Sequence, residues 1–240
     1  MLTVKNLSIH FPSRHGEVQA LDRVNLSVKP GEIVGLVGES GSGKSVLSYA
    51  ISGLLDPAAR VVGGQILWHG TAIAPIREHR TIRAAVAQIF QNPRASLNPI
   101  RTVGRQLQDL AGKEQVRPLL ESVRLAAGIA QRYPFELSGG QCQRIGIALA
   151  LACKPDLLIA DEPTTGLDVT TEAAIMSLIA ELSRMQGRAT LLVTHNLSGP
   201  LPPCRFAMRC KRREGDCDAA PPQLASAGHD HLVACRHPLC

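Results

Sequence analysis

The chain has 240 residues, of which 45% are hydrophobic and 19% are charged, and its formal net charge is +6 at pH 7. This balance excludes a disordered or fibrous chain, and the length suits one principal domain, alone or with a small appendage. The basic residues are scattered apart from one cluster at residues 211–213, so we do not expect nucleic acid as a partner.

Apolar runs are short throughout the sequence. None approaches the roughly 20 residues that a helix needs to cross a bilayer, and the first residues lack the apolar stretch of a signal peptide. We therefore expect a cytoplasmic protein that does not itself span a membrane.

The beginning of the chain alternates apolar and polar residues. Positions 2, 4, 7, 9 and 11 are apolar and residues 24–28 repeat the pattern, which predicts two half-buried antiparallel strands with a turn over residues 12–16. Residues 33–37 form a continuous apolar run bounded by glycines, which predicts a buried strand, and residues 45–55 have helical spacing.

The rest of the sequence alternates strands with helices. Residues 65–68 and 86–90 are predicted strands, and the segment 103–130 has helical composition. Ser138 and Gln141 have the spacing of a capping box ahead of a helix. The predicted elements after them are a helix over 142–153, a buried strand over 157–160, a helix over 171–185 and a buried strand over 190–194.

This order of elements predicts an α/β fold. Its centre would be a mostly parallel sheet covered on both faces, with an antiparallel β subdomain at the amino terminus and a short helical subdomain over about residues 100–155. In such folds, ligands bind at the carboxyl ends of the parallel strands. The motifs that carry chemistry follow such strand ends.

A glycine-rich loop follows the predicted strand at residues 33–37. It fits the pattern G-x-x-x-x-G-K-[ST] between a strand and a helix, which is the context of a phosphate-binding loop. In such a loop the backbone N–H groups converge on phosphate oxygens, the lysine neutralises the outer phosphates, and the serine hydroxyl binds Mg²⁺. Its residues are Gly38, Glu39, Ser40, Gly41, Ser42, Gly43, Lys44 and Ser45.

Two carboxylates, Asp161 and Glu162, follow the predicted buried strand at residues 157–160. A carboxylate at such a strand end can hold Mg²⁺ through water. Taken alone, an acidic pair is equally typical of a solvated strand end or a helix cap.

The segment Leu137-Ser138-Gly139-Gly140-Gln141, between the phosphate loop and the acidic pair, resembles the signature of the ATP-binding cassette (ABC) family. The resemblance implies a P-loop NTPase cassette over residues 1–196 that binds ATP and Mg²⁺. It places Ser45 and Asp161 at the metal and makes Glu162 the catalytic base for the attacking water.

The same resemblance implies a partner. In the family the signature closes over the ATP of a second cassette, so Ser138, Gly139, Gly140 and Gln141 would complete the site of a homodimeric or heterodimeric partner. Asp168 matches the loop that contacts the partner cassette.

Three further residues have roles that the resemblance implies. Gln91 and the loop through Pro99 match the segment by which peptide importers link the catalytic site to the transmembrane subunits, and Gln91 would also face the metal. His195 matches the switch histidine that contacts the γ-phosphate. Phe11 is the candidate for stacking on adenine, although a phenylalanine in a strand is usually a core residue.

Residues 197–240 form a cysteine-rich tail. Its candidate ligands are separated by 5, 6 and 17 residues, without the close pairs of structural zinc sites, so an iron–sulfur cluster suits them at least as well. The tail resembles the carboxyl-terminal region of dipeptide and oligopeptide importer ATPases, where such cysteines bind a four-iron cluster in some members; reduced, unliganded thiols stay the alternative. The candidates are Cys204, Cys210, Cys217 and Cys235.

The chain departs from the family between these regions. Only eight residues separate His195 from Cys204, whereas relatives continue after the switch histidine with a helix and further strands. We therefore expect an internal deletion that truncates the sheet after His195 and leaves unpaired backbone groups at its edge.

The features together predict the ATP-hydrolysing subunit of a dipeptide or oligopeptide importer of the peptide/nickel type. Transmembrane permease subunits would attach it to the cytoplasmic face of the inner membrane, and an extracytoplasmic solute-binding protein would act with it indirectly. Two alternatives stay open: a cassette that is non-catalytic or impaired owing to the deletion, and a soluble cassette ATPase of DNA repair or translation.

Overall fold

A computed structural model describes residues 1–14, 16–73, 85–185, 187–194, 214, 225–226 and 232–233. The chain divides into two compact units, Met1–Asn196 and Leu197–Cys240. In the second unit the described residues include a two-stranded antiparallel sheet of β9 (Ala225–Ser226) and β10 (Leu232–Val233). Five predicted site residues lie outside the described ones: His195, Cys204, Cys210, Cys217 and Cys235.

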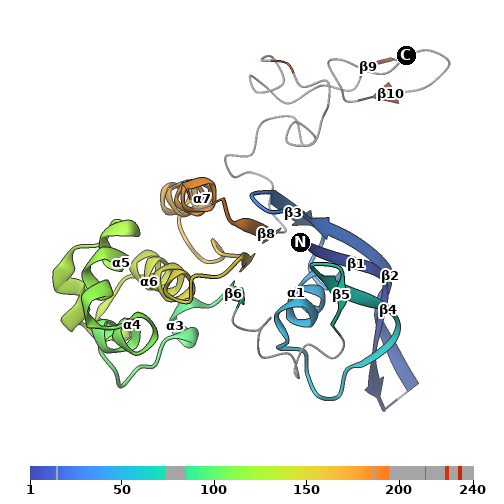
Figure 1. Cartoon of the computed structure of the whole chain (residues 1–240), viewed down its shortest axis with the longest axis horizontal. Helices are drawn as coiled ribbons and strands as arrows, with labels where there is room; N and C mark the ends of the chain where they lie inside the picture. The colour runs from blue at the N-terminus through green and yellow to red at the C-terminus, as the bar shows by residue number, and fades with distance from the viewer. Residues whose placement is uncertain are drawn as a thin grey trace. The chain divides into compact units, whose positions relative to one another are not determined.

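The first unit begins with an antiparallel sheet, drawn in blue to teal in Figure 1. The predicted alternation is confirmed in its first strand, where Leu2, Val4, Leu7 and Ile9 are at most 1% exposed. The sheet order is β2-β1-β4-β5, and its strands are β1 (Leu2–Ser13), β2 (Gly16–Val28), β4 (Arg60–Trp68) and β5 (Thr71–Ala72).

The pairing of β1 with β4 shifts register between Lys5 and Ser8, and Gly64 lies opposite this irregularity. Gly64 has a φ of +76°, and a Cβ atom there would lie 2.2 Å from the carbonyl oxygen of Asn6. The two backbones therefore approach each other too closely for any side chain at position 64.

We expect Gly64→Ala to lower the free energy of unfolding by about 2–5 kcal/mol, because the left-handed backbone and the backbone clash both oppose a Cβ atom. Gly70→Ala is the control, since Gly70 has a φ of +85° but no atom within 4 Å of its Cβ position. It should lose only about 1 kcal/mol. Urea unfolding of the two variants checks this, and equal losses would contradict the close-approach explanation.

The second sheet of this unit is parallel, as predicted. Its order is β3-β8-β7-β6, and every described pairing in it is parallel. The two central strands are buried along their whole lengths, which confirms two of the predicted buried strands. The strands are β3 (Ile33–Val37), β6 (Val86–Ile89), β7 (Leu157–Asp161) and β8 (Ala189–Thr194).

The prediction of a buried strand at residues 33–37 was wrong in part. Val34 is buried, but Gly35 is exposed and Val37 is 41% exposed. The reason is position: among the described residues β3 pairs only with β8, so it is an edge strand of the sheet. The last described strand of this unit is β8, which ends at Thr194, directly before the predicted switch histidine.

The helical segment predicted over residues 103–130 is broken. Gly112, with a φ of +84°, ends the first helix, and Arg124, with a φ of +60°, follows the second. The helices of the unit are α1 (Lys44–Ser52), α3 (Pro93–Ser96), α4 (Val103–Ala111), α5 (Val116–Ser122), α6 (Gly139–Ala152) and α7 (Val169–Met185), with 3₁₀ turns η2 (Lys113–Gln115), η3 (Ala127–Gln131) and η4 (Pro134–Glu136).

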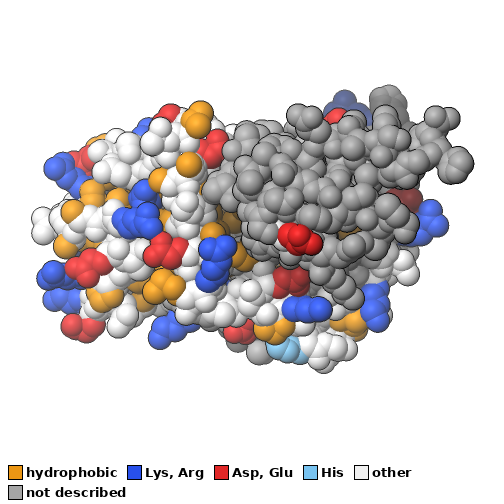
Figure 2. Space-filling model, turned by 90° about the horizontal axis from the view of Figure 1, so that it is seen from above, with side chains coloured by type: hydrophobic (Ala, Val, Ile, Leu, Met, Phe, Trp, Pro, Cys, Tyr) orange, Lys and Arg blue, Asp and Glu red, His pale blue; other side chains and the backbone are white. Residues whose placement is uncertain are grey.

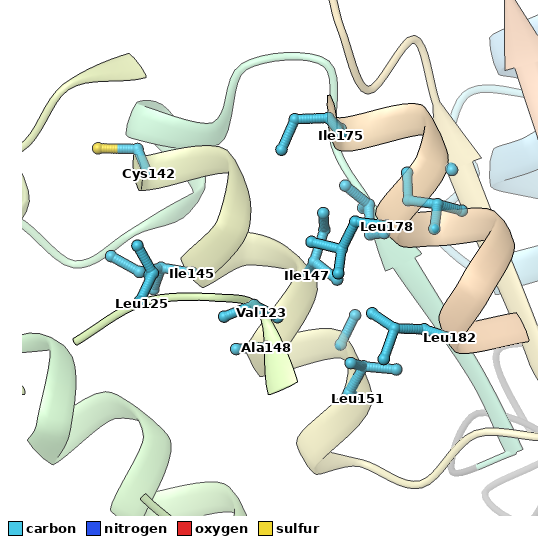
Figure 3. Packing of buried hydrophobic residues seen from close by; sticks show 14 of the residues in the cluster. Val123, Leu125, Cys142, Ile145, Ile147, Ala148, Leu151, Ile175, Leu178 and Leu182 are labelled. Carbon is cyan, nitrogen blue, oxygen red and sulfur yellow. The ribbon is translucent and has the colours of Figure 1, made fainter. Parts of the chain in front are cut away.

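The parallel sheet separates two apolar cores. Side chains of β7 alternate between them: Leu158 and Ala160 pack with α4 to α7, whereas Leu157 and Ile159 pack with α1 and the antiparallel sheet. Figure 3 shows part of the first core, where Ile147 and Leu151 of α6 face Leu178 and Leu182 of α7. The sheet is thus fixed on both faces, and the motifs at its strand ends are held on a rigid support.

The surface carries both signs of charge. On the face seen in Figure 2, the coloured Lys and Arg side chains are interspersed with Asp and Glu. Within the described ranges, no helix is both long and apolar enough to cross a membrane.

Candidate functional site

The glycine-rich loop leaves β3 at Val37 and enters α1 at Lys44. Gly41 and Gly43 have φ values of +81° and +89°, a conformation that glycine adopts without strain. A Cβ atom at Gly43 would also lie 2.6 Å from the carbonyl oxygen of Ala20 in β2. The loop therefore lies directly against the antiparallel sheet at the amino terminus of α1.

Lys44 folds back over this loop. Its side chain is 7% exposed, and its ammonium group donates hydrogen bonds to the carbonyl oxygens of Gly38 at 2.8 Å and Glu39 at 2.7 Å. The positive charge is thus held at the mouth of the loop, where the N-terminal end of α1 adds a partial positive charge. This arrangement suits a polyphosphate anion.

Asp161, the last residue of β7, lies beneath the start of α1. It is 3% exposed, and its two carboxylate oxygens each accept a bond from a serine of α1: Oδ1 from Ser45 at 3.4 Å and Oδ2 from Ser48 at 3.2 Å. Burial raises the pKa of this carboxyl group, and the two serine hydroxyls oppose that rise. The carboxylate is therefore held in a fixed orientation at the edge of the loop.

Glu162 follows with a φ of +46°, in the left-handed region, and its N–H donates to the carbonyl oxygen of Val193 at 2.9 Å. Its Oε2 accepts hydrogen bonds from Gln91 Nε2 at 2.8 Å and from the Thr165 hydroxyl at 3.1 Å. The backbone turn and these two donors fix the direction of the carboxylate. A hollow of about 190 Å³ opens beside it, and its lining includes Glu162, Thr165 and Thr194.

The signature segment forms the amino terminus of α6. The predicted capping box is confirmed: the Ser138 hydroxyl accepts from the N–H of Gln141 at 3.3 Å, and the Gln141 side chain accepts from the N–H of Ser138 at 3.0 Å. Gly140 packs so closely that a Cβ atom there would lie 2.7 Å from Thr171 of α7. This contact ties the signature segment to the start of α7.

Asp168 acts as a cap for α7. It is exposed, and its Oδ1 accepts from the Thr171 N–H at 2.9 Å while Oδ2 accepts from the Thr171 hydroxyl at 2.6 Å. The hydroxyl and then the backbone hydrogen bond lower the pKa of this carboxyl group. Thr171 therefore links the Asp168 loop to the signature segment.

Phe11 lies in β1 directly opposite Val18 of β2. Phe11 is partly buried against the core on the α1 side of the sheet, whereas Val18 is 54% exposed. Ala20, two residues beyond Val18 on the same face of β2, reaches the phosphate-binding loop through its carbonyl oxygen. Phe11 therefore lies on β1, the strand paired with the one that approaches the loop.

The structure brings together Lys44, Ser45, Asp161, Glu162 and Gln91, which come from three separate segments: the start of α1, the end of β7 and the residues after β6. Two residues that bond directly to this group were not identified from the sequence: Ser48, which bonds to Asp161, and Thr165, which bonds to Glu162. Two further residues bond to their neighbours: Gln88 to Ser48, and Thr171 to Asp168. Ser48 alone had a signal, because a serine three residues after Ser45 lies on the same face of a helix.

Comparisons with known proteins agree on one family. A family model described as "ABC transporter" matches residues 21–165. The dipeptide transport ATP-binding protein DppD of Escherichia coli (strain K12) is 45% identical over 213 residues, which cover 82% of this chain and 65% of that protein. The oligopeptide transport ATP-binding protein OppD of Salmonella typhimurium is 42% identical over 212 residues, which cover 82% of this chain and 63% of that protein.

Solved structures give the same result. A dimeric, post-hydrolysis structure of the ATP-binding cassette MJ0796 bound to ADP and Pi matches with a TM-score of 0.71 and 31% identity over 82% of this chain and 89% of that chain. The structure of cbiO1 from Clostridium perfringens matches with a TM-score of 0.70 and 28% identity. The chain spans slightly less than two thirds of the length of the two curated relatives.

Proposed function

The chain belongs to the ABC transporter family, and from this premise we propose that it binds ATP with Mg²⁺ and hydrolyses it as the energising subunit of a peptide importer. One observation carries the proposal. The ammonium of Lys44 above the glycine loop, the Ser45–Asp161 pair and the Gln91–Glu162 pair converge at the carboxyl ends of β3, β6 and β7.

The residues at this place fit Mg²⁺. Within the described part of the chain, no group of three or more His, Cys, Asp or Glu side chains could hold a metal by itself. Mg²⁺ does not require one, because it keeps several waters and takes one or two protein oxygens beside the phosphates of its nucleotide. Ser45 and Asp161 supply a hydroxyl and a carboxylate 3.4 Å apart.

Each residue then has a defined task in phosphoryl transfer to water. The loop N–H groups and Lys44 bind the outer phosphates and hold the nucleotide in place. Glu162, held by Gln91 and Thr165, orients the attacking water and accepts its proton. When bound, Mg²⁺ supplies charge neutralisation at the phosphates. We assign the γ-phosphate contact to His195 and adenine stacking to Phe11 on the family resemblance.

We propose that two cassettes act together. The capped amino terminus of α6 presents Ser138 and the N–H groups of the two glycines, which suit a phosphate of a second chain's nucleotide. The dimeric state described for MJ0796 supports this assignment. The link from Asp168 through Thr171 to Gly140 would connect the partner-facing loop with the signature.

The transported solute is proposed from the relatives. Both DppD and OppD are transport ATP-binding proteins, for dipeptides and oligopeptides respectively. We infer that permease subunits hold this chain peripherally at the cytoplasmic face of the membrane and that a solute-binding protein delivers the peptide. The four-iron cluster in the cysteine tail stays a proposal, which iron and acid-labile sulfide analysis of the purified chain would test.

The experiment for the whole proposal is reconstitution. The purified chain is combined with candidate permease subunits, a second cassette and a peptide-binding protein from the same organism, and peptide uptake into vesicles is measured with Mg-ATP inside or outside. We expect uptake that requires ATP on the side of the cassettes. ATP hydrolysis without any stimulation by the permease would favour a soluble ATPase, and nucleotide binding without hydrolysis would favour the impaired cassette.

A further inference from the structure

We propose that Ser48 is a positioning residue for the metal site: it fixes the Asp161 carboxylate in the orientation that Mg²⁺ requires. The inference rests on the proposed function, because it concerns the metal that accompanies ATP. Ser48 is not part of the glycine-loop pattern and would not itself touch the metal or the nucleotide.

The two carboxylate oxygens of Asp161 have different hydrogen-bond partners. Ser45 Oγ lies 3.4 Å from Oδ1, and Ser48 Oγ lies 3.2 Å from Oδ2. Ser45 is half-buried at the mouth of the loop, whereas Ser48 is fully buried one turn further into α1. Oδ2 therefore points into the protein, and Oδ1 is left beside Ser45 on the side of the phosphate loop.

Gln88 of β6 extends this arrangement by one link. Its Nε2 donates to Ser48 Oγ at 3.4 Å. A serine hydroxyl has one proton, which Ser48 shares between Asp161 Oδ2 and the carbonyl oxygen of Ser45, and its oxygen can accept from Gln88 at the same time. The resulting order, Gln88 to Ser48 to Asp161, directs the donors of this chain toward the carboxylate and restricts its rotation.

The Gln88 side chain bonds to Ser48 through its nitrogen only. Its Oε1 is buried and has no hydrogen-bond partner among the described residues. An unsatisfied buried acceptor costs about 1–3 kcal/mol.

A merely structural serine is available for comparison on the same helix. Ser52 lies one turn after Ser48, is 9% exposed and bonds through its hydroxyl to the carbonyl oxygen of Tyr49 at 3.4 Å. Ser48 makes the equivalent bond to the carbonyl oxygen of Ser45 at 3.1 Å. The two serines share the local contact, and Ser48 alone of the two has the bond to Asp161.

The test compares Ser48→Ala with Ser52→Ala in the full chain. The affinity for a non-hydrolysable ATP analogue is measured by calorimetry, once with Mg²⁺ and once with EDTA. Loss of a residue that orients a metal ligand typically weakens metal binding 10- to 100-fold. We expect Ser48→Ala to bind the analogue at least about tenfold more weakly than the original chain does when Mg²⁺ is present. In EDTA the two affinities should be equal. Ser52→Ala should match the original chain in both.

The outcomes are separable. If the original chain shows no Mg²⁺-dependent binding, the proposed function itself fails. If it does, and Ser48→Ala retains the full effect of Mg²⁺, the positioning role is refuted. An equal loss with Mg²⁺ and with EDTA would also refute it, because it would mean that the substitution damages the loop as a whole. Gln88→Met should also reduce the gain in affinity that Mg²⁺ produces. An unchanged gain in that variant would refute the contribution of Gln88 to the orientation of Asp161.

Discussion

Replacing Glu162 by Gln should reduce ATP hydrolysis by at least about 100-fold while leaving Mg-ATP binding within about threefold, because a general base typically contributes 10²–10⁴-fold. The amide oxygen of Gln can still accept from Gln91 and Thr165, so the local geometry is preserved. What is lost is the ability to take a proton from water. Phosphate release and calorimetric binding of the same samples measure the two effects.

The control for this variant is Glu172→Gln. Glu172 lines the same hollow, and its Oε1 accepts from the Thr164 hydroxyl at 3.1 Å, a bond that the amide oxygen can also accept. This control should hydrolyse ATP at the original rate. If the two variants lose activity equally, removing either carboxylate from the hollow impairs hydrolysis, and the assignment of Glu162 as the base is wrong.

Replacing Lys44 by Met should weaken Mg-ATP binding by about 10- to 100-fold, because hydrogen bonds to charged groups contribute about 1.5–3 kcal/mol each. Met keeps most of the apolar stem, which is buried, and removes only the ammonium that bonds to Gly38 and Glu39. Binding of a fluorescent ATP analogue measures the loss.

Lys29→Met is the control for Lys44→Met. It makes the same substitution at an exposed lysine just after the end of β2. Its affinity should not change. Unaltered binding in Lys44→Met would show that the loop does not hold the phosphates as proposed, whatever the identity of the nucleotide.

Much of this site follows from the sequence, because its residues lie within short motifs. The glycine loop needs only a strand before it and a helix after it, and the Ser138–Gln141 capping box depends on a spacing of three residues. The burial of β7 and β8 followed from their unbroken apolar runs. Local patterns of this kind determine local structure.

The remaining features depend on which segments become neighbours. Val37 is exposed because β3 lies at an edge of the described sheet, and nothing in the run from Ile33 to Val37 reveals a missing neighbour. The bond between Ser48 and Asp161 joins residues 113 positions apart. By contrast, the break at Gly112 has a local cause, since a glycine with a positive φ is a common helix end.

The central claim is that this chain binds ATP through its glycine loop with the help of Mg²⁺. Calorimetric titration of the purified full chain with a non-hydrolysable ATP analogue, with Mg²⁺ and then with EDTA, tests it most directly. We expect one nucleotide per chain, tighter binding with Mg²⁺, and a loss of that binding in Lys44→Met. Absence of nucleotide binding, or binding that ignores both Mg²⁺ and Lys44, would contradict it.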